Sequence, residues 1–141
     1  IFLMDPTCNH TKNYVLEAIR ALTDHGMEVI EFCSPNISSY MKDTSLSSKT
    51  IISIDDVTST GKSSLVDISD LIDMGAVVLP RSIFSYDFPI AERNFNDYGL
   101  TSKSILKFEE LIGEFERLKI LSLSEMLKIT KWHESIVSMQ K

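Results

Sequence analysis

One stretch of the sequence decides the fold: Thr50-Ile51-Ile52-Ser53-Ile54-Asp55-Asp56-Val57-Thr58-Ser59-Thr60-Gly61-Lys62-Ser63-Ser64. Its apolar first part, residues 50–54, predicts a buried strand, and two carboxylates follow directly. After a loop of small residues, residues 63–74 carry apolar side chains at helical spacing. Open α/β sheets bind their ligands at the carboxyl ends of the strands. We therefore expect a binding site where this strand ends.

The loop after the predicted strand is suited to a phosphate group. The main-chain N–H groups from Ser59 to Ser64 can converge there, and the positive end of the following helix dipole points at the same place. Asp55 and Asp56 are too acidic to face a phosphate, but they can accept hydrogen bonds from a sugar diol. The pattern predicts a ligand with a phosphate at one end and vicinal hydroxyls several ångströms away, such as a ribose 5-phosphate group. For each single residue, ordinary capping of a strand-to-helix turn is the alternative.

The flanking segments extend this unit into alternating strands and helices. Hydrophobic periodicity predicts further strands at residues 1–4, 27–33, 76–79 and 101–106, and helices at residues 12–25 and 89–97. This alternation predicts an α/β fold with a parallel twisted sheet flanked by helices. The tail changes character, because apolar stripes over residues 108–118 and 123–136 predict two more helices.

Length and composition limit the possible classes of protein. A length of 141 residues and a content of 43% hydrophobic side chains predict a single domain over residues 1–141. Its formal charge of −6 repels the phosphate backbone of nucleic acid, so we expect small-molecule partners and no nucleic acid. His10, His25 and His133 lie at no metal-ligand spacing, so no protein metal centre is predicted.

Location and completeness follow from other features of the chain. No apolar run of about 18 residues is present, so we expect no membrane association. Cys8 and Cys33 are too few for a disulfide framework and favour a reducing, cytoplasmic setting. The sequence opens at Ile1 inside a predicted strand, from which we expect that a natural N-terminal portion is missing.

The residues Thr60-Gly61-Lys62-Ser63 also contain the ending of a nucleoside triphosphate P-loop. That motif needs a glycine five residues before Gly61, so that the loop can wrap the phosphates. Asp56 occupies that position and brings a side chain and a negative charge. A P-loop is therefore the weaker interpretation of this segment.

Residues 51–64 resemble the 5-phosphoribosyl-1-pyrophosphate (PRPP) motif of type I phosphoribosyltransferases, with an apolar strand, two acidic residues and a Thr/Ser- and Gly-containing loop. Residues 75–95 are similar to orotate phosphoribosyltransferases, which carry Ile-Phe-x-Tyr-x-Phe-Pro-x-Ala here. The final Lys131-Trp132-His133 also looks like that group's ending. The resemblance implies a type I phosphoribosyltransferase-like core, with the N-terminal hood missing from this chain.

The same resemblance implies a reaction and a set of site residues. The reaction would transfer the ribose 5-phosphate of PRPP to a nucleobase, orotate being favoured, with release of pyrophosphate in pyrimidine nucleotide biosynthesis. Mg²⁺ would bind mainly through the pyrophosphate, and the protein would be a homodimer. The implied catalytic residues are Asp55, Asp56 and Lys42. The implied substrate-binding residues are Thr58, Ser59, Thr60, Gly61, Lys62, Ser63, Ser64, Tyr86 and Phe88.

A rival hypothesis is a catalytically degenerate relative that binds PRPP as a sensor or interaction module. The segment from Asp5 to His10 stands where the family places its pyrophosphate loop, but it carries an aspartate there. Between residues 35 and 49, only Lys42 and Lys49 offer a cation for the leaving group. The two hypotheses share PRPP binding and differ in the release of pyrophosphate.

Overall fold

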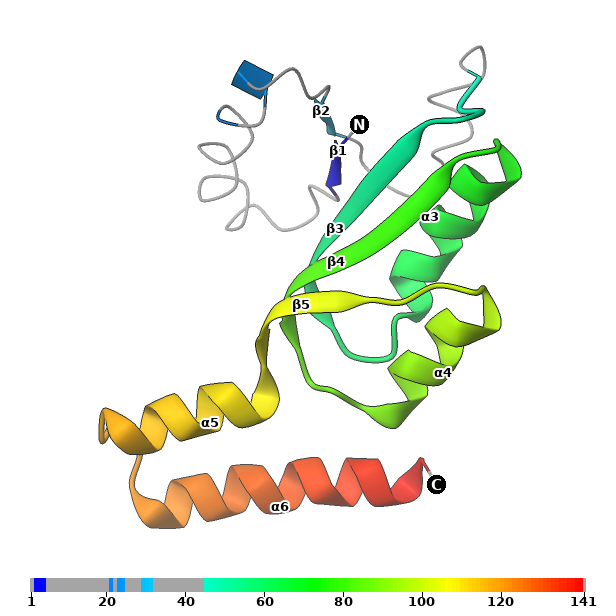
Figure 1. The fold of residues 1–141 in the computed structure, drawn as a ribbon. Helices are drawn as coiled ribbons and strands as arrows, with labels where there is room; N and C mark the ends of the chain where they lie inside the picture. The colour runs from blue at the N-terminus through cyan, green and yellow to red at the C-terminus, as the bar shows by residue number, and fades with distance from the viewer. Residues whose placement is uncertain (1, 5–20, 22, 25–28, 32–44, 141) are drawn as a thin grey trace.

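The computed structural model describes residues 2–4, 21, 23–24, 29–31 and 45–140 (Figure 1). Its elements, in chain order, are β1 (Phe2–Met4), β2 (Val29–Glu31), β3 (Thr50–Thr58), α3 (Lys62–Asp73), β4 (Val77–Ser85), α4 (Pro89–Asp97), β5 (Lys103–Lys107), α5 (Phe108–Arg117) and α6 (Leu123–Met139). Of the helix predicted at residues 12–25, only residues 21, 23 and 24 are described, as helix.

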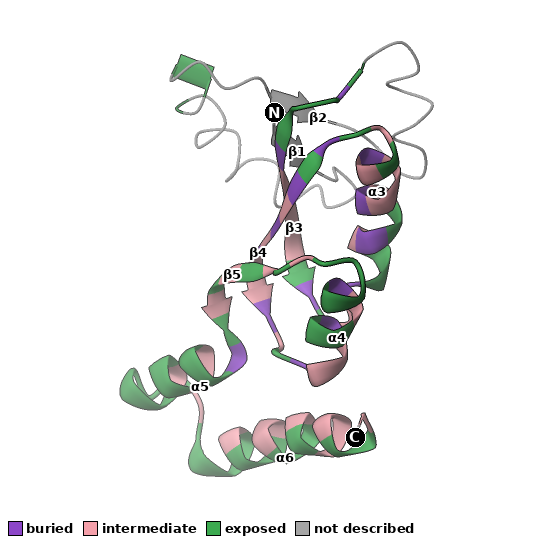
Figure 2. Ribbon diagram, turned by 45° about the vertical axis from the view of Figure 1, so that its right-hand side comes forward, coloured by how far each residue is buried: buried purple, intermediate pink, exposed green. Residues whose placement is uncertain are grey.

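The five strands form one sheet in the order β2-β1-β3-β4-β5, and every neighbouring pair is parallel. This confirms the predicted parallel α/β fold with flanking helices. Because parallel neighbours need a crossover, α3 connects β3 to β4 and α4 connects β4 to β5. Figures 1 and 2 both show α3 and α4 on the same side of these three strands.

The core lies between that side of the sheet and the two helices. Leu65, Ile68 and Leu71 form the buried stripe of α3, and they pack with Ile51 of β3 and Val78 of β4. The purple inner side of α3 in Figure 2 marks this stripe. The helical spacing that predicted α3 is therefore the spacing of the core contacts.

Strand β3 is longer than the sequence predicted. Pairing with β4 continues beyond Ile54, with Asp55 opposite Ser82 and Thr58 opposite Ser85. Asp55 and Asp56 thus belong to the strand, although the apolar pattern that marks it ends at Ile54. Ladder hydrogen bonds do not require apolar side chains, which is why periodicity alone placed the end of the strand too early.

The buried positions of β4 change phase near its end. Val78, Pro80 and Ser82 alternate as buried residues, but the next buried residue is Ser85, three positions on. In the same region Asp56 has no partner in the register between β3 and β4. This shift brings Ser85 and its partner Thr58 to buried positions at the end of the sheet.

Helices α5 and α6 extend from the sheet as a pair (Figure 1). A capping box starts α6, because the Ser122 N–H donates to Glu125 Oε2 at 2.8 Å and the Glu125 N–H donates to Ser122 Oγ at 3.4 Å. No residue of α6 is buried. Within the part of the chain that the structure describes, no helix is long and apolar enough to cross a membrane.

The core packing of α3 predicts a large difference between two neighbouring truncations. Ile68 is 0% exposed and Val66 is 60% exposed on the same helix. We expect Ile68→Ala to lower the free energy of unfolding by about 2–5 kcal/mol, because it leaves a cavity. Val66→Ala should change it by less than about 0.5 kcal/mol. Urea denaturation of both variants tests this, and equal effects would contradict the packing described.

Candidate functional site

The turn from β3 into α3 depends on Gly61, which adopts the left-handed conformation at φ +71°. A Cβ atom at this position would lie 2.6 Å from Cε2 of Phe95 in α4, closer than two carbon atoms can approach. Glycine is thus required twice here, by the backbone angle and by the neighbouring ring. The loop of residues 59–61 therefore passes directly over α4.

Helix α3 begins without a side-chain cap and without an acidic residue in its first turn. The Lys62 N–H has a long hydrogen bond of 3.4 Å to Thr60 Oγ1. Among the described residues, no acceptor binds the N–H groups of Ser63 and Ser64. Free N–H groups at the positive end of a helix dipole attract an anion. This is the local feature that the sequence predicted.

Two carbonyl groups of the loop are held by donors from the next part of the chain. The Tyr86 N–H donates to the Thr58 carbonyl at 3.1 Å. Asn94 Nδ2 of α4 donates to the Thr60 carbonyl at 2.8 Å. Because both carbonyls are occupied, the loop is held from the side of β4 and α4.

The two aspartates have different surroundings. The Ser64 hydroxyl of α3 donates to Asp55 Oδ2, and the Asp56 Oδ1 atom accepts from the Val57 N–H at 2.7 Å. Burial raises the pKa of the Asp55 carboxyl above its usual value. The hydrogen bond from Ser64 partly opposes this rise, whereas the neighbouring Asp56 carboxyl adds to it. Asp55 is therefore a carboxylate whose charge the folded protein alone does not fully stabilise.

The predicted residues of the strand and the loop lie together at one end of the sheet, but they differ in exposure and in hydrogen bonding. Ser59, Lys62 and Ser63 are exposed, whereas Thr58 is 4% exposed. The hydroxyl of Ser64 was expected to hold a phosphate, but it is directed to Asp55, so only the N–H of that residue is available to an anion. Lys42 and the segment from Asp5 to His10 lie outside the described residues.

A cavity of about 640 Å³ lies next to the loop, and the sequence did not predict it. One wall is apolar and comes mainly from α4, the other carries hydroxyl groups of β4 and β5, and Thr58 links it to the loop. Charged groups also line it, among them the ion pair of Asp87 and Lys107 at 3.0 Å. The principal lining residues are Thr58, Ser85, Phe88, Phe95, Lys103 and Ser104. The small hydroxyl side chains at residues 101, 102 and 104 were the available signal.

Tyr86 and Phe88, predicted to contact a base, lie in an aromatic cluster that also contains Phe108, Trp132 and His133. The Phe88 ring is stacked on Tyr86 at 5.2 Å and on His133 at 5.2 Å, and Phe88 is only 7% exposed. These contacts anchor α6 to the end of β4. Contact of Tyr86 or Phe88 with a base stays a prediction, and in this arrangement the Phe88 ring is already covered by protein.

The site offers few ligands for a metal ion. Among the described residues, no group of three or more His, Cys, Asp and Glu side chains is placed to hold a metal. The two aspartates alone supply fewer than the six oxygen ligands that Mg²⁺ prefers. A magnesium ion here would need most of its oxygen ligands from a substrate and from water.

Comparison with known proteins gives a sequence relative and a solved structure of similar fold. No protein-family model matches the chain. It is 31% identical over 86 residues to the orotate phosphoribosyltransferase of Cytophaga hutchinsonii, a match that covers 60% of this chain and 41% of that protein. The chain therefore spans about two fifths of this curated relative.

Among solved structures, the UMP synthase of Leishmania donovani has a TM-score of 0.56 at 16% identity, over 63% of this chain and 20% of that one. The orotate phosphoribosyltransferase of Mycobacterium tuberculosis in complex with PRPP has a TM-score of 0.48 at 17% identity, over 60% of this chain and 51% of that one. The likeness of fold is carried by the first of these two structures.

The contact of Gly61 with Phe95 predicts the effect of adding a methyl group. Gly99 has a similar φ of +68°, but nothing lies within 4 Å of its hypothetical Cβ, so it is a matched control. We expect Gly99→Ala to cost about 1–2 kcal/mol of stability from backbone strain alone. Gly61→Ala should cost about 1–3 kcal/mol more, because Phe95 must move. Chemical denaturation measures both, and equal losses would contradict the close contact.

The raised pKa of Asp55 predicts that replacing this carboxylate with a neutral side chain stabilises the folded protein, and that the gain in stability depends on pH. Folding favours the protonated carboxyl, so its contribution is full below the usual carboxyl pKa and is lost as pH rises through the folded pKa. Asp55→Asn keeps an oxygen that accepts from Ser64 and carries no charge. We expect the variant to unfold at a higher temperature than the wild type at pH 7, with a smaller difference at pH 4. A difference that grows on acidification would contradict the direction of the shift.

Proposed function

We propose that this chain is a member of the type I phosphoribosyltransferase family, and that it binds PRPP and transfers the ribose 5-phosphate to a nucleobase with release of pyrophosphate. One observation supports this most directly. The carboxylates of Asp55 and Asp56 lie near the end of the central strand β3, two to three residues before it ends at Thr58, and an uncapped helix start with free N–H groups follows at Lys62. A phosphosugar needs both kinds of group at a short separation.

The proposed binding mode assigns a separate role to each part of the site. The N–H groups of Ser63 and Ser64, with the exposed Lys62 beside them, bind the 5-phosphate. Asp55 and Asp56 accept hydrogen bonds from the ribose hydroxyls. Burial disfavours the charged form of Asp55, which is why the pKa of its carboxyl is raised. Hydrogen bonds donated by the ribose hydroxyls stabilise that charged form, so ligand binding offsets the unfavourable effect of burial.

The proposed reaction is a substitution at the anomeric carbon. A base nitrogen forms the new C–N bond, the C–O bond to pyrophosphate breaks with its electron pair leaving on oxygen, and the proton of the attacking nitrogen passes to solvent. Positive charge develops on the ribose ring as pyrophosphate leaves. The neighbouring carboxylates of Asp55 and Asp56 stabilise that charge, and the held phosphate fixes the orientation of the ring.

Magnesium enters this proposal with the substrate. The pyrophosphate oxygens and water complete the coordination that Asp55 and Asp56 cannot provide alone. When bound, the ion neutralises charge on the leaving group. Lys42 is proposed as a further cation for pyrophosphate, on the family resemblance alone.

We propose that the acceptor base enters beside the 640 Å³ cavity, which meets the loop at Thr58. Lys103 brings a cation to its wall and has no ion-pair partner among the described residues, which suits an acceptor with an acidic group such as orotate. Orotate as the acceptor, pyrimidine biosynthesis as the pathway, a homodimer and a cytoplasmic location are parts of the proposal that rest on the resemblance and the relative.

A sensor that binds PRPP without catalysis is the second candidate. The aspartate in the segment from Asp5 to His10 favours it, because a negative charge repels pyrophosphate unless a metal ion intervenes. The third interpretation, a P-loop, has less support from the structure. Asp56 to Thr58 lie in β3, so they cannot form the first half of a loop wrapped around phosphates.

Calorimetry with PRPP and Mg²⁺ tests the proposal. We expect binding by the wild type, and an affinity lower by on the order of 100-fold in the double variant Asp55→Asn with Asp56→Asn, because charge-assisted hydrogen bonds to the ribose are lost. Asp73→Asn, at the far end of α3, is the matched control and should bind like the wild type. Unchanged affinity in the double variant would overturn the assignment.

A second measurement separates the two candidates. Pyrophosphate release is followed with PRPP, Mg²⁺ and a panel of bases that includes orotate. Release with one base identifies an enzyme and its acceptor, whereas PRPP binding without release with any base identifies the sensor.

A further inference from the structure

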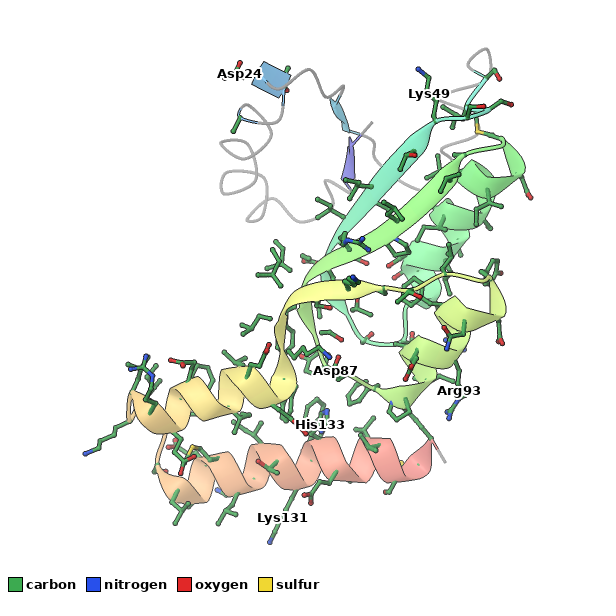
Figure 3. All side chains as sticks on the ribbon, viewed as in Figure 1. Asp24, Lys49, Asp87, Arg93, Lys131 and His133 are labelled. Atoms are coloured by element: carbon green, nitrogen blue, oxygen red, sulfur yellow. The ribbon has the colours of Figure 1, made fainter. Side chains whose placement is uncertain are left out.

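Tyr86 connects the phosphate-binding loop to the C-terminal helix through its own peptide groups. Its N–H donates to the carbonyl of Thr58, the last residue of β3, at 3.1 Å. Its carbonyl oxygen lies 2.6 Å from Nε2 of His133, which comes from α6, 47 residues later in the chain. Figure 3 shows His133 on the side of α6 that faces the end of the sheet. A single residue thus joins the start of the loop to α6.

His133 is held in the orientation that this hydrogen bond requires. Its ring is stacked on Phe108 with centroids 3.9 Å apart and planes 6° apart, and on Phe88 at 5.2 Å and 23°. A carbonyl oxygen can only accept, so Nε2 carries the proton. This holds for the neutral ring and for the imidazolium, so the contact does not depend on the charge of His133.

A second connection runs in parallel from the end of α6 into α4. Gln140 Oε1 accepts from the Ile90 N–H at 3.3 Å, and Arg93 donates to the carbonyl of Gln140. One residue after Arg93, Asn94 donates to the Thr60 carbonyl of the loop. Helix α6 therefore supports both segments whose donors hold the loop carbonyls.

We infer that His133 is a positioning residue for the phosphate-binding loop, acting through Tyr86 on Thr58. The inference rests on the proposed function for its ligand, but the mechanical connection can be measured without any ligand. The contacts that the described part of the chain gives His133 are with Tyr86, Phe88 and Phe108, and none of these residues belongs to the loop of residues 59–61. The hydrogen bond from His133 holds the carbonyl of Tyr86, and the N–H of the same residue, in the preceding peptide group, holds the Thr58 carbonyl from which the loop departs.

Two substitutions separate the hydrogen bond from the ring contacts. His133→Phe keeps an aromatic ring between Phe88 and Phe108 and removes the donor. His133→Gln keeps an N–H donor at a similar reach and gives up the stacking. Lys131→Gln is the control, because Lys131 is exposed and points away from the sheet in Figure 3.

Amide hydrogen exchange of the full chain is the first readout. We expect the Tyr86 amide to exchange about tenfold faster in His133→Phe, and at a rate close to that of the wild type in His133→Gln and Lys131→Gln. Wild-type exchange in His133→Phe would overturn the inference. Exchange in His133→Gln as fast as in His133→Phe would also overturn it, because the donor would then not be the cause. If His133→Phe does not fold, retained protection in His133→Gln supports the inference and lost protection overturns it.

PRPP affinity in the presence of Mg²⁺ is the second readout. We expect about a tenfold weaker affinity in His133→Phe and recovery in His133→Gln, and an unchanged affinity in His133→Phe would overturn the positioning role. A wild type that binds no PRPP would refute the proposed function. The exchange measurement would still decide whether His133 holds Tyr86.

Discussion

The close contact between Gly61 and Phe95 is the constraint on which the site depends. It brings α4 against the loop that leaves β3, with no room for even one methyl group between them. At that separation Asn94 reaches the Thr60 carbonyl, a residue 34 positions earlier in the chain. The shape of the loop is thus imposed from outside by the helix beneath it. A loop supported in this way pays little entropy when it orders around a ligand.

A half-buried carboxylate, that of Asp55, lies beside this supported loop. The packing of the loop stabilises the folded protein, whereas the buried charge destabilises it. Asp55 is held by Ser64 in a position where burial and the charge of Asp56 both raise its pKa. Such an arrangement lowers the stability of the ligand-free protein. It persists where a ligand with hydroxyl groups or a cation compensates the charge, and perturbed carboxylates are accordingly frequent at functional sites. The same residue is therefore a cost to folding and the strongest local indication of function.

The sequence was most informative where local pattern and tertiary structure agree. The spacing of Leu65, Ile68 and Leu71 predicted α3 because those residues are the core contacts. The strand and loop from residue 50 to 64 predicted a strand, a small-residue turn and a helix start, and the structure has all three in that order.

Features that depend on distant residues were not predictable in this way. The end of β3 at Thr58 is decided by pairing with β4, which polar residues can join without any apolar pattern. The residues that line the cavity come mainly from β4, α4 and β5, so no single segment of the sequence contains a pattern that predicts the cavity. Aromatic residues near a binding site can stack on a base or pack against other side chains, and the sequence around Tyr86 and Phe88 does not distinguish the two roles. The position of α6 shows that Tyr86 packs against Trp132 and Phe88 against His133.

The strand order has a consequence for how such a site can change. From β1 the chain moves outward to β2 and then returns to place β3 on the opposite side of β1. The strand order thus reverses at β1, and open parallel sheets bind their ligands at the carboxyl ends of the strands next to such a reversal. Substitutions in the connections after β1 and β3 can change which molecule is held and how tightly. The strand order fixes this position and no side chain does, so a substitution that removes the chemistry leaves the position unchanged.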